Sequence, residues 1–142
     1  MFKRYLFIFL WVIAAVALTA VCSAHGVKAE TEADRQKLFK RYGWDVSVSP
    51  ISVTEVKLPD APDTVYEQYN KIQKKAGFDL APYYGKTAVR YTYKVYNHKE
   101  SENTEVYANI LVCGGKMIGG DIMSTSLDGF MHAVNEREFQ IK

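Results

Sequence analysis

EVYANILVCGGKMIGGDIMST, residues 105–125, has the pattern of two strands joined by a tight turn. Gly114-Gly115 suits a type I′ turn, which needs positive φ at both central residues, and glycine adopts that conformation at no steric cost. A turn at this point also predicts the register, which opposes Val112 to Met117, Ala108 to Asp121 and Val106 to Met123. The stretch therefore predicts an antiparallel hairpin in which Asp121 shares a face with Val106, Ala108 and Met123.

The residues before this hairpin predict further strands. In residues 86–97, Val89, Tyr91, Tyr93 and Val95 alternate with polar side chains, which is typical of a half-buried strand. Residues 44–58 also have an extended pattern, but Pro50 interrupts it. We therefore expect an edge strand or two short pieces there.

Two helices are predicted ahead of the strands. Thr31 is placed to cap the first, which Gly43 ends. The second follows the turn at residues 59–62 and ends at Gly77, and its expected buried stripe is Val65, Tyr69, Ile72 and Ala76. The predicted fold class is α+β: an antiparallel three- to four-stranded sheet with one or two helices packed on one face, preceded by an N-terminal transmembrane or signal helix.

Residues 1–29 predict a membrane anchor or a signal segment. Lys3 and Arg4 form a basic head, and residues 6–24 contain no charged side chain. A helix of that length rises about 28 Å, close to the roughly 30 Å of a bilayer core. The basic head predicts that the remaining chain lies outside the cytoplasm. Two outcomes are open: a single-pass anchor in the cell membrane, or secretion after cleavage behind Ala24 or Ala29.

The rest of the chain predicts a single α+β domain at residues 30–134 and a polar tail at 135–142 that we expect to fray. Lipid modification of Cys22 is disfavoured, because Val21 stands where that processing requires a small residue. Cys113 is the one cysteine of the predicted domain, so no disulfide can form within it.

The charge balance argues against nucleic-acid binding. The 18 Lys and Arg residues include Lys3 and Arg4, so 16 basic and 16 acidic residues remain from His25 onward. A domain without net positive charge lacks the electrostatic footprint for a phosphate backbone.

Few side chains suggest chemistry. Asp121, Asp128 and His132 are the weak catalytic candidates. Asp128 and His132 would share a helix face, but Gly129 between them weakens a helix, and two ligands do not make a metal site. No motif for a cofactor is present, since Gly119-Gly120 lacks the ending of a phosphate loop. Among the many tyrosines, Tyr83, Tyr84 and Tyr96 are candidates for an aromatic binding surface.

Several short motifs resemble a known family. They are the run from Tyr69 to Leu80 with Tyr84-Gly85-Lys86, together with Arg41-Tyr42-Gly43-Trp44, Arg90-Tyr91-Thr92-Tyr93, Ile118-Gly119-Gly120-Asp121 and Leu127-Asp128-Gly129-Phe130-Met131-His132. The pattern resembles an uncharacterised bacterial family, found mainly in Firmicutes and catalogued only as a domain of unknown function, the one numbered 4830. The resemblance covers residues 38–132 and implies a bacterial, envelope-associated protein. It carries over no activity.

From these observations we expect a membrane-tethered extracytoplasmic domain without enzymatic activity, which binds another envelope protein or a wall polymer. The alternative is an extracytoplasmic hydrolase that uses Asp121, Asp128 and His132. Convergence of these three side chains in one pocket would favour the enzyme, whereas a flat aromatic face would favour binding.

Overall fold

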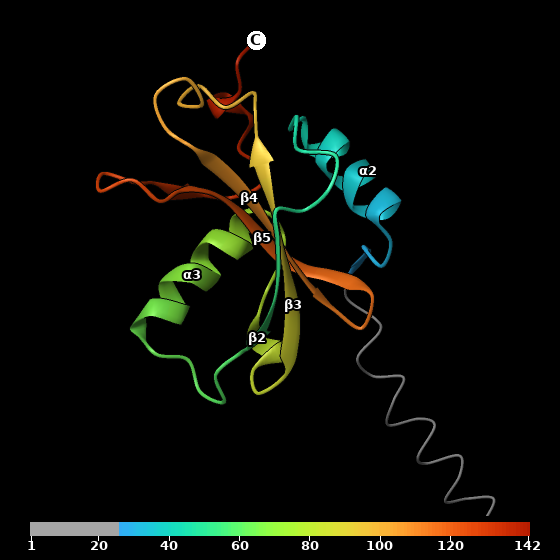
Figure 1. Ribbon diagram of the computed structural model, residues 1–142. Coiled ribbons are helices and arrows are strands. Elements are labelled where there is room, and N and C mark those ends of the chain that lie inside the picture. The colour runs from blue at the N-terminus through green and yellow to red at the C-terminus, as the bar shows by residue number, and fades with distance from the viewer. Residues whose placement is uncertain (1–25) are drawn as a thin grey trace, which may run out of the picture.

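The computed structural model describes residues 26–142, which form a six-stranded antiparallel sheet with a helix on each face (Figure 1). The elements are β1 (Val27–Lys28), α2 (Glu32–Tyr42), β2 (Ser52–Lys57), α3 (Thr64–Lys75), the 3-10 helix η2 (Ala81–Tyr83), β3 (Thr87–Val95), β4 (Val106–Cys113), β5 (Lys116–Ser124), β6 (Met131–His132) and the 3-10 helix η3 (Arg137–Phe139). The strand order is β1-β5-β4-β3-β2, and β6 also pairs with β5. The α+β class is confirmed. The sheet has more strands than predicted. β1 and β6 were not predicted, because strands of two residues are too short to show an alternating pattern.

The glycine turn between β4 and β5 is confirmed. Gly114 and Gly115 both have positive φ, 57° and 75°, as a type I′ turn requires. Next to the turn, Val112 pairs with Met117 as predicted. The first helix is confirmed as well: Thr31 and Asp34 form a reciprocal capping box at its start, and Gly43 ends it with φ 85°.

Farther from the turn the predicted register is wrong by one residue. A β-bulge follows the Val112–Met117 pair, so Ala108 pairs with Ile122 and Asn109 pairs with Asp121. Side chains alternate along a strand, and a shift of one residue therefore exchanges the two faces. Asp121 consequently lies on the face opposite to the one predicted.

The helices cover opposite faces of the sheet, so the prediction that both pack on one face is wrong. Leu38 and Phe39 of α2 belong to the cluster that contains Ala108 and Ile110 of β4. The other face contributes Leu111 of β4 to a smaller cluster, against which the α3 tyrosines Tyr66 and Tyr69 pack. Figure 1 shows α2 and α3 on the two sides of the sheet.

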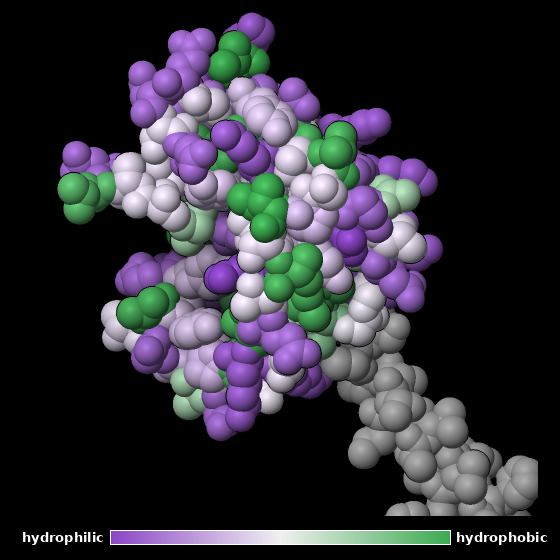
Figure 2. All heavy atoms as spheres, in the orientation of Figure 1, coloured by the Kyte–Doolittle hydropathy of each residue, from purple (hydrophilic) through white to green (hydrophobic). Residues whose placement is uncertain are grey.

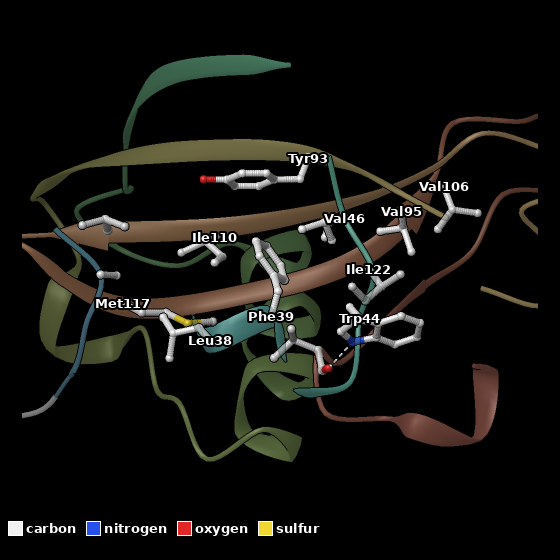
Figure 3. Packing of buried hydrophobic residues seen from close by; sticks show 14 of the residues in the cluster. Leu38, Phe39, Trp44, Val46, Tyr93, Val95, Val106, Ile110, Met117 and Ile122 are labelled. Atoms are coloured by element: carbon white, nitrogen blue, oxygen red, sulfur yellow. Dashed lines mark hydrogen bonds between the residues drawn. The ribbon is translucent and has the colours of Figure 1, made fainter. Parts of the chain in front are cut away.

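The larger cluster, on the α2 face, also fixes the segment after α2. Tyr93 is fully buried, with its ring 4.9 Å from that of Phe39 in an edge-to-face arrangement. The Tyr93 hydroxyl accepts a hydrogen bond from Arg35 Nε at 2.8 Å, which satisfies its polar end. The Trp44 indole is buried in the same cluster, and its N–H donates to the Val134 carbonyl at 2.6 Å, the bond drawn as a dashed line in Figure 3.

The buried side of α3 is polar. Asn70 and Gln73 are its buried residues, whereas Val65 of the predicted apolar stripe is 72% exposed. Asn70 accepts from the Leu80 N–H at 2.8 Å, and Gln73 accepts from the Gly120 N–H at 2.7 Å. These bonds attach α3 to the following loop and to β5, and the other three residues of the predicted stripe, Tyr69, Ile72 and Ala76, are half-buried.

Both ends of the described chain join the fold. Val27 and Lys28 pair with Met117 and Lys116, and Ala29 is fully buried, although residues 1–29 were assigned to the leader. The tail at 135–142 is hydrogen-bonded to the rest of the fold, since the Ile141 N–H bonds to the Asn97 carbonyl at 2.9 Å. Residues 27–29 and the tail are therefore part of the hydrogen-bonded fold, although the sequence pattern placed them outside the domain.

The predicted membrane segment, residues 6–24, lies outside the described residues, and so do the cleavage point after Ala24 and the Cys22 position. Within residues 26–142, none of the helices is both long enough and apolar enough to cross a bilayer.

Candidate functional site

A groove of about 420 Å³ lies between α3 and the sheet. We call it the α3 groove. Its apolar lining comes from the helix and from four strands or their ends: Val56, Leu58, Val65, Tyr66, Tyr69, Ile72, Leu111, Met123 and Met131. Its polar lining is Gln68, Arg90, Asn109 and Asp121. Figure 2 shows the surface hollowed between α3 and the loop that follows β5. An apolar concavity with a few polar groups is the usual form of a ligand site.

Asp121 is the buried acceptor at the floor of this groove, with only 1% of its surface exposed. It accepts hydrogen bonds from the Tyr69 hydroxyl at 2.8 Å and from Asn109 Nδ2 at 3.0 Å. Asn109 Oδ1 in turn accepts from the Thr92 hydroxyl at 2.7 Å. The bulge in β5 places Asp121 here, which the predicted register missed.

Burial dominates the electrostatics of this network. It raises the pKa of Asp121, while the hydrogen bonds from Asn109 and Tyr69 and the charge of Arg90 oppose the shift. The pKa of Tyr69 lies well above its usual value, first through burial and then through the neighbouring Asp121 carboxylate. Tyr69 is therefore a stable hydroxyl donor at neutral pH. The carboxylate is held as a structural acceptor.

Arg90 is the basic group of the groove. It lies on β3, where it pairs with Thr54 on one side and Leu111 on the other, and it is exposed. Within residues 26–142, its guanidinium makes no hydrogen bond or ion pair, although its charge acts on Asp121 and Tyr69.

The three candidate catalytic residues do not converge. Asp121 lines the α3 groove, whereas Asp128 and His132 line a second pocket. His132 is paired with Ile122, the neighbour of Asp121 in β5, and adjacent strand residues point to opposite faces. Asp128 lies in the loop between β5 and β6 rather than on the helix that would have aligned it with His132.

The second pocket contains a histidine pair that the sequence did not suggest. His98 and His132 are buried, and their Nε2 atoms are 3.1 Å apart. The Glu100 N–H donates to His98 Nδ1, so the neutral His98 ring carries its proton on Nε2 and donates to His132. His132 Nδ1 then donates to the Ala133 carbonyl, at 2.9 Å. This assignment satisfies all four ring nitrogens.

Aromatic rings enclose the histidine pair. Phe130 stacks on His98 at 4.6 Å between centroids, Phe139 lies 4.3 Å from His132, and Trp44 lies 5.9 Å from both. Burial first, and then the charge of His132, lowers the pKa of His98. Among the described residues there is no group of three side chains suited to a metal ion. His98 lies in the β3–β4 loop, His132 in β6 and Phe139 in the tail, so the contacts of the pair hold these three segments together.

The three candidate tyrosines do not form one surface. Tyr83 is buried in the smaller cluster, Tyr84 is half-buried beside it, and Tyr96 is 51% exposed. Tyr83 and Tyr84 precede β3, whereas Tyr96 follows it, so the length of this nine-residue strand separates them. The groove tyrosines, Tyr66 and Tyr69, were not among the candidates.

A family model described as Domain of unknown function (DUF4830) matches residues 38–122. The match spans more than half of the chain, including α3, β3, β4 and most of β5. No curated protein matches the chain. No solved structure matches it either.

Proposed function

The chain belongs to the DUF4830 family, and we propose that it is a membrane-tethered, non-enzymatic domain outside the cytoplasm that binds a partner in the cell envelope. The partner, another protein or a wall polymer, inserts an apolar group into the α3 groove. The observation that carries this proposal is the groove itself, an apolar concavity of about 420 Å³ beside an exposed arginine.

A binding role fits the state of the groove's polar groups better than catalysis does. Two donors already engage the Asp121 carboxylate, one on each oxygen. A general acid or base needs a reactive partner within hydrogen-bond reach, and the other two catalytic candidates line a different pocket. The geometry therefore gives the hydrolase alternative no support.

The proposed location rests on the apolar run at residues 6–24 and the basic head before it. If a peptidase removes the leader, we propose the cut after Ala24, because a cut after Ala29 would also remove β1 and a buried alanine. Protease added to intact protoplasts should then degrade the domain. Full protection, with the protein in the cytosolic fraction, would refute this topology.

Site-specific crosslinking tests the groove as a binding surface. A benzophenone amino acid replaces Val65, which lines the groove and is 72% exposed. The matched control replaces Glu67, an exposed residue of α3 that does not line it. In intact cells, position 65 should yield an envelope adduct that position 67 does not. Equal adducts at both positions, or none at position 65, would refute the proposal.

A further inference from the structure

We propose that the α3 groove binds the chain of a single-chain acidic amphiphile of the fatty-acid type, with the acidic headgroup at Arg90. The inference rests on the proposed function, since it takes the same groove as the binding site, and it assigns that groove a membrane amphiphile in place of a protein or a wall polymer. It follows from which polar groups of the lining remain available, from the size of the groove and from the side chains at its mouth.

The polar lining divides into engaged and available groups. Asp121 and Asn109 bond to each other, and Tyr69 and Thr92 complete their network. Arg90 is exposed, and no hydrogen bond or ion pair within residues 26–142 engages its guanidinium. Guanidinium groups bind carboxylates through paired N–H donors. The available charge at the groove therefore complements an acid.

The buried carboxylate does not reverse this preference. Asp121 is only 1% exposed, and its two oxygens already accept from Tyr69 and Asn109. Because the carboxylate is almost completely covered, a cationic headgroup could reach it only if the lining of the groove opened. An acidic headgroup at Arg90 needs no such rearrangement. The hydrocarbon chain of the ligand then lies over Asp121.

The volume of the groove fits one hydrocarbon chain. An apolar cavity of about 150 Å³ holds a benzene ring, so a groove of about 420 Å³ has room for roughly 15 non-hydrogen atoms. That is the size of a fatty acid of about 12 carbons, and it is too small for a two-chain phospholipid. Met123 and Met131 line the groove, and unbranched methionine side chains adapt readily to a flexible chain.

Photolabelling of the full chain in phosphatidylcholine vesicles tests the inference. The probe is dodecanoic acid with a diazirine near the end of its chain, and the matched probe carries an amine in place of the acid. After irradiation, mass spectrometry locates the adducts. Arg90→Gln removes the charge at the groove. Arg41→Gln is the control, because Arg41 is an exposed residue of α2, on the opposite face.

We expect the acid probe to label groove residues such as Ile72, Met123 and Met131. Labelling should fall on the order of tenfold with the amine probe and with Arg90→Gln, as loss of a charge-assisted hydrogen bond predicts, and should not change with Arg41→Gln. Equal labelling by the two probes, no effect of Arg90→Gln, or adducts confined to residues outside the groove would each overturn the inference. If the crosslink at position 65 persists in that case, only the ligand class is wrong, and the binding function stands.

Discussion

Replacing Asp121 by alanine removes the acceptor of two hydrogen bonds beneath the α3 groove. Asn109 Nδ2 and the Tyr69 hydroxyl, at 3.0 and 2.8 Å, lose their partner together. Asp121→Asn keeps the shape and one acceptor oxygen, and its new amide N–H can donate to the Tyr69 oxygen. We therefore expect the order of stability to be wild type, then Asp121→Asn, then Asp121→Ala.

The structure sets the size of the expected effect. A buried donor left unpaired costs about 1–3 kcal/mol, and the alanine variant leaves two. Part of this loss is offset because burial disfavours the charged carboxylate, as its raised pKa shows. A net loss of about 2 kcal/mol for Asp121→Ala and about 1 kcal/mol for Asp121→Asn follows. For a domain of this size, 2 kcal/mol lowers the melting temperature by roughly 6–12 °C.

Thermal and urea unfolding of residues 25–142 measures these differences, and this range retains β1. Asp128→Ala is the matched control, an exposed carboxylate in a loop, and should stay within about 0.5 kcal/mol of wild type. The pKa of Asp121 is raised in the fold, so the folded state binds its proton more readily than the unfolded state does. Wild type should therefore gain stability relative to Asp121→Asn as the pH falls from 7 toward 4. If both Asp121 variants melt at or above the wild-type temperature, the structural account of this carboxylate fails.

Three further outcomes are expected. Gly115→Val should lower the free energy of unfolding by about 1–2 kcal/mol, since position 115 has φ 75°; a wild-type melting temperature would contradict a strained turn. The pKa of His98 lies below 6.5, so unfolding takes up a proton and stability should fall as the pH drops below 6.5. Urea unfolding of wild type and His98→Gln between pH 5 and 7.5 checks this, and identical pH slopes would refute it. Cys113, the one cysteine among the described residues, should remain a reduced thiol in the monomer; a dimer that a reductant breaks, seen by intact mass, would reveal a missed interface.

Local signals predicted the parts of the fold that depend on local geometry. Thr31 and Gly43 bound α2 because capping is decided within one helical turn. The type I′ turn follows from Gly114-Gly115 in the same way, since few residues other than glycine tolerate positive φ twice. The register near the turn was correct for the same reason.

Features set by tertiary contacts could not be predicted from such signals. The bulge in β5 depends on how the strand pairs: Gly119-Gly120 is compatible with a bend there, but two glycines do not specify which residue is left unpaired. The buried polar residues of α3 were not predicted, since Gln73 accepts a hydrogen bond from Gly120, 47 residues away, and Asn70 accepts one from Leu80 in the following loop. Both features concern the elements that border the α3 groove. The groove could therefore not be predicted from the sequence. The register error also put Asp121 on the wrong face.

The histidine pair was missed for a simpler reason. His98 and His132 are 34 residues apart, and the sequence pattern pointed to Asp128 as the partner of His132, while His98 belongs to no motif. The tail that encloses them is polar in sequence, yet Phe139 stacks on His132. A single aromatic residue in a charged segment is a weak signal until the fold shows what it packs against.

The closure of the first strand onto the last long strand sets the order of events during synthesis. β1 can pair only after β5 has been synthesised. The carbonyl that accepts the hydrogen bond of the Trp44 indole belongs to Val134, 90 residues farther along the chain. Such distant contacts must wait for closure of long loops, which slows folding. A chain emerging N-terminus first therefore leaves the apolar side of α2 uncovered until almost all of it has been made. During that interval the nascent chain should depend on holding chaperones, and truncations before Val134 should aggregate rather than fold.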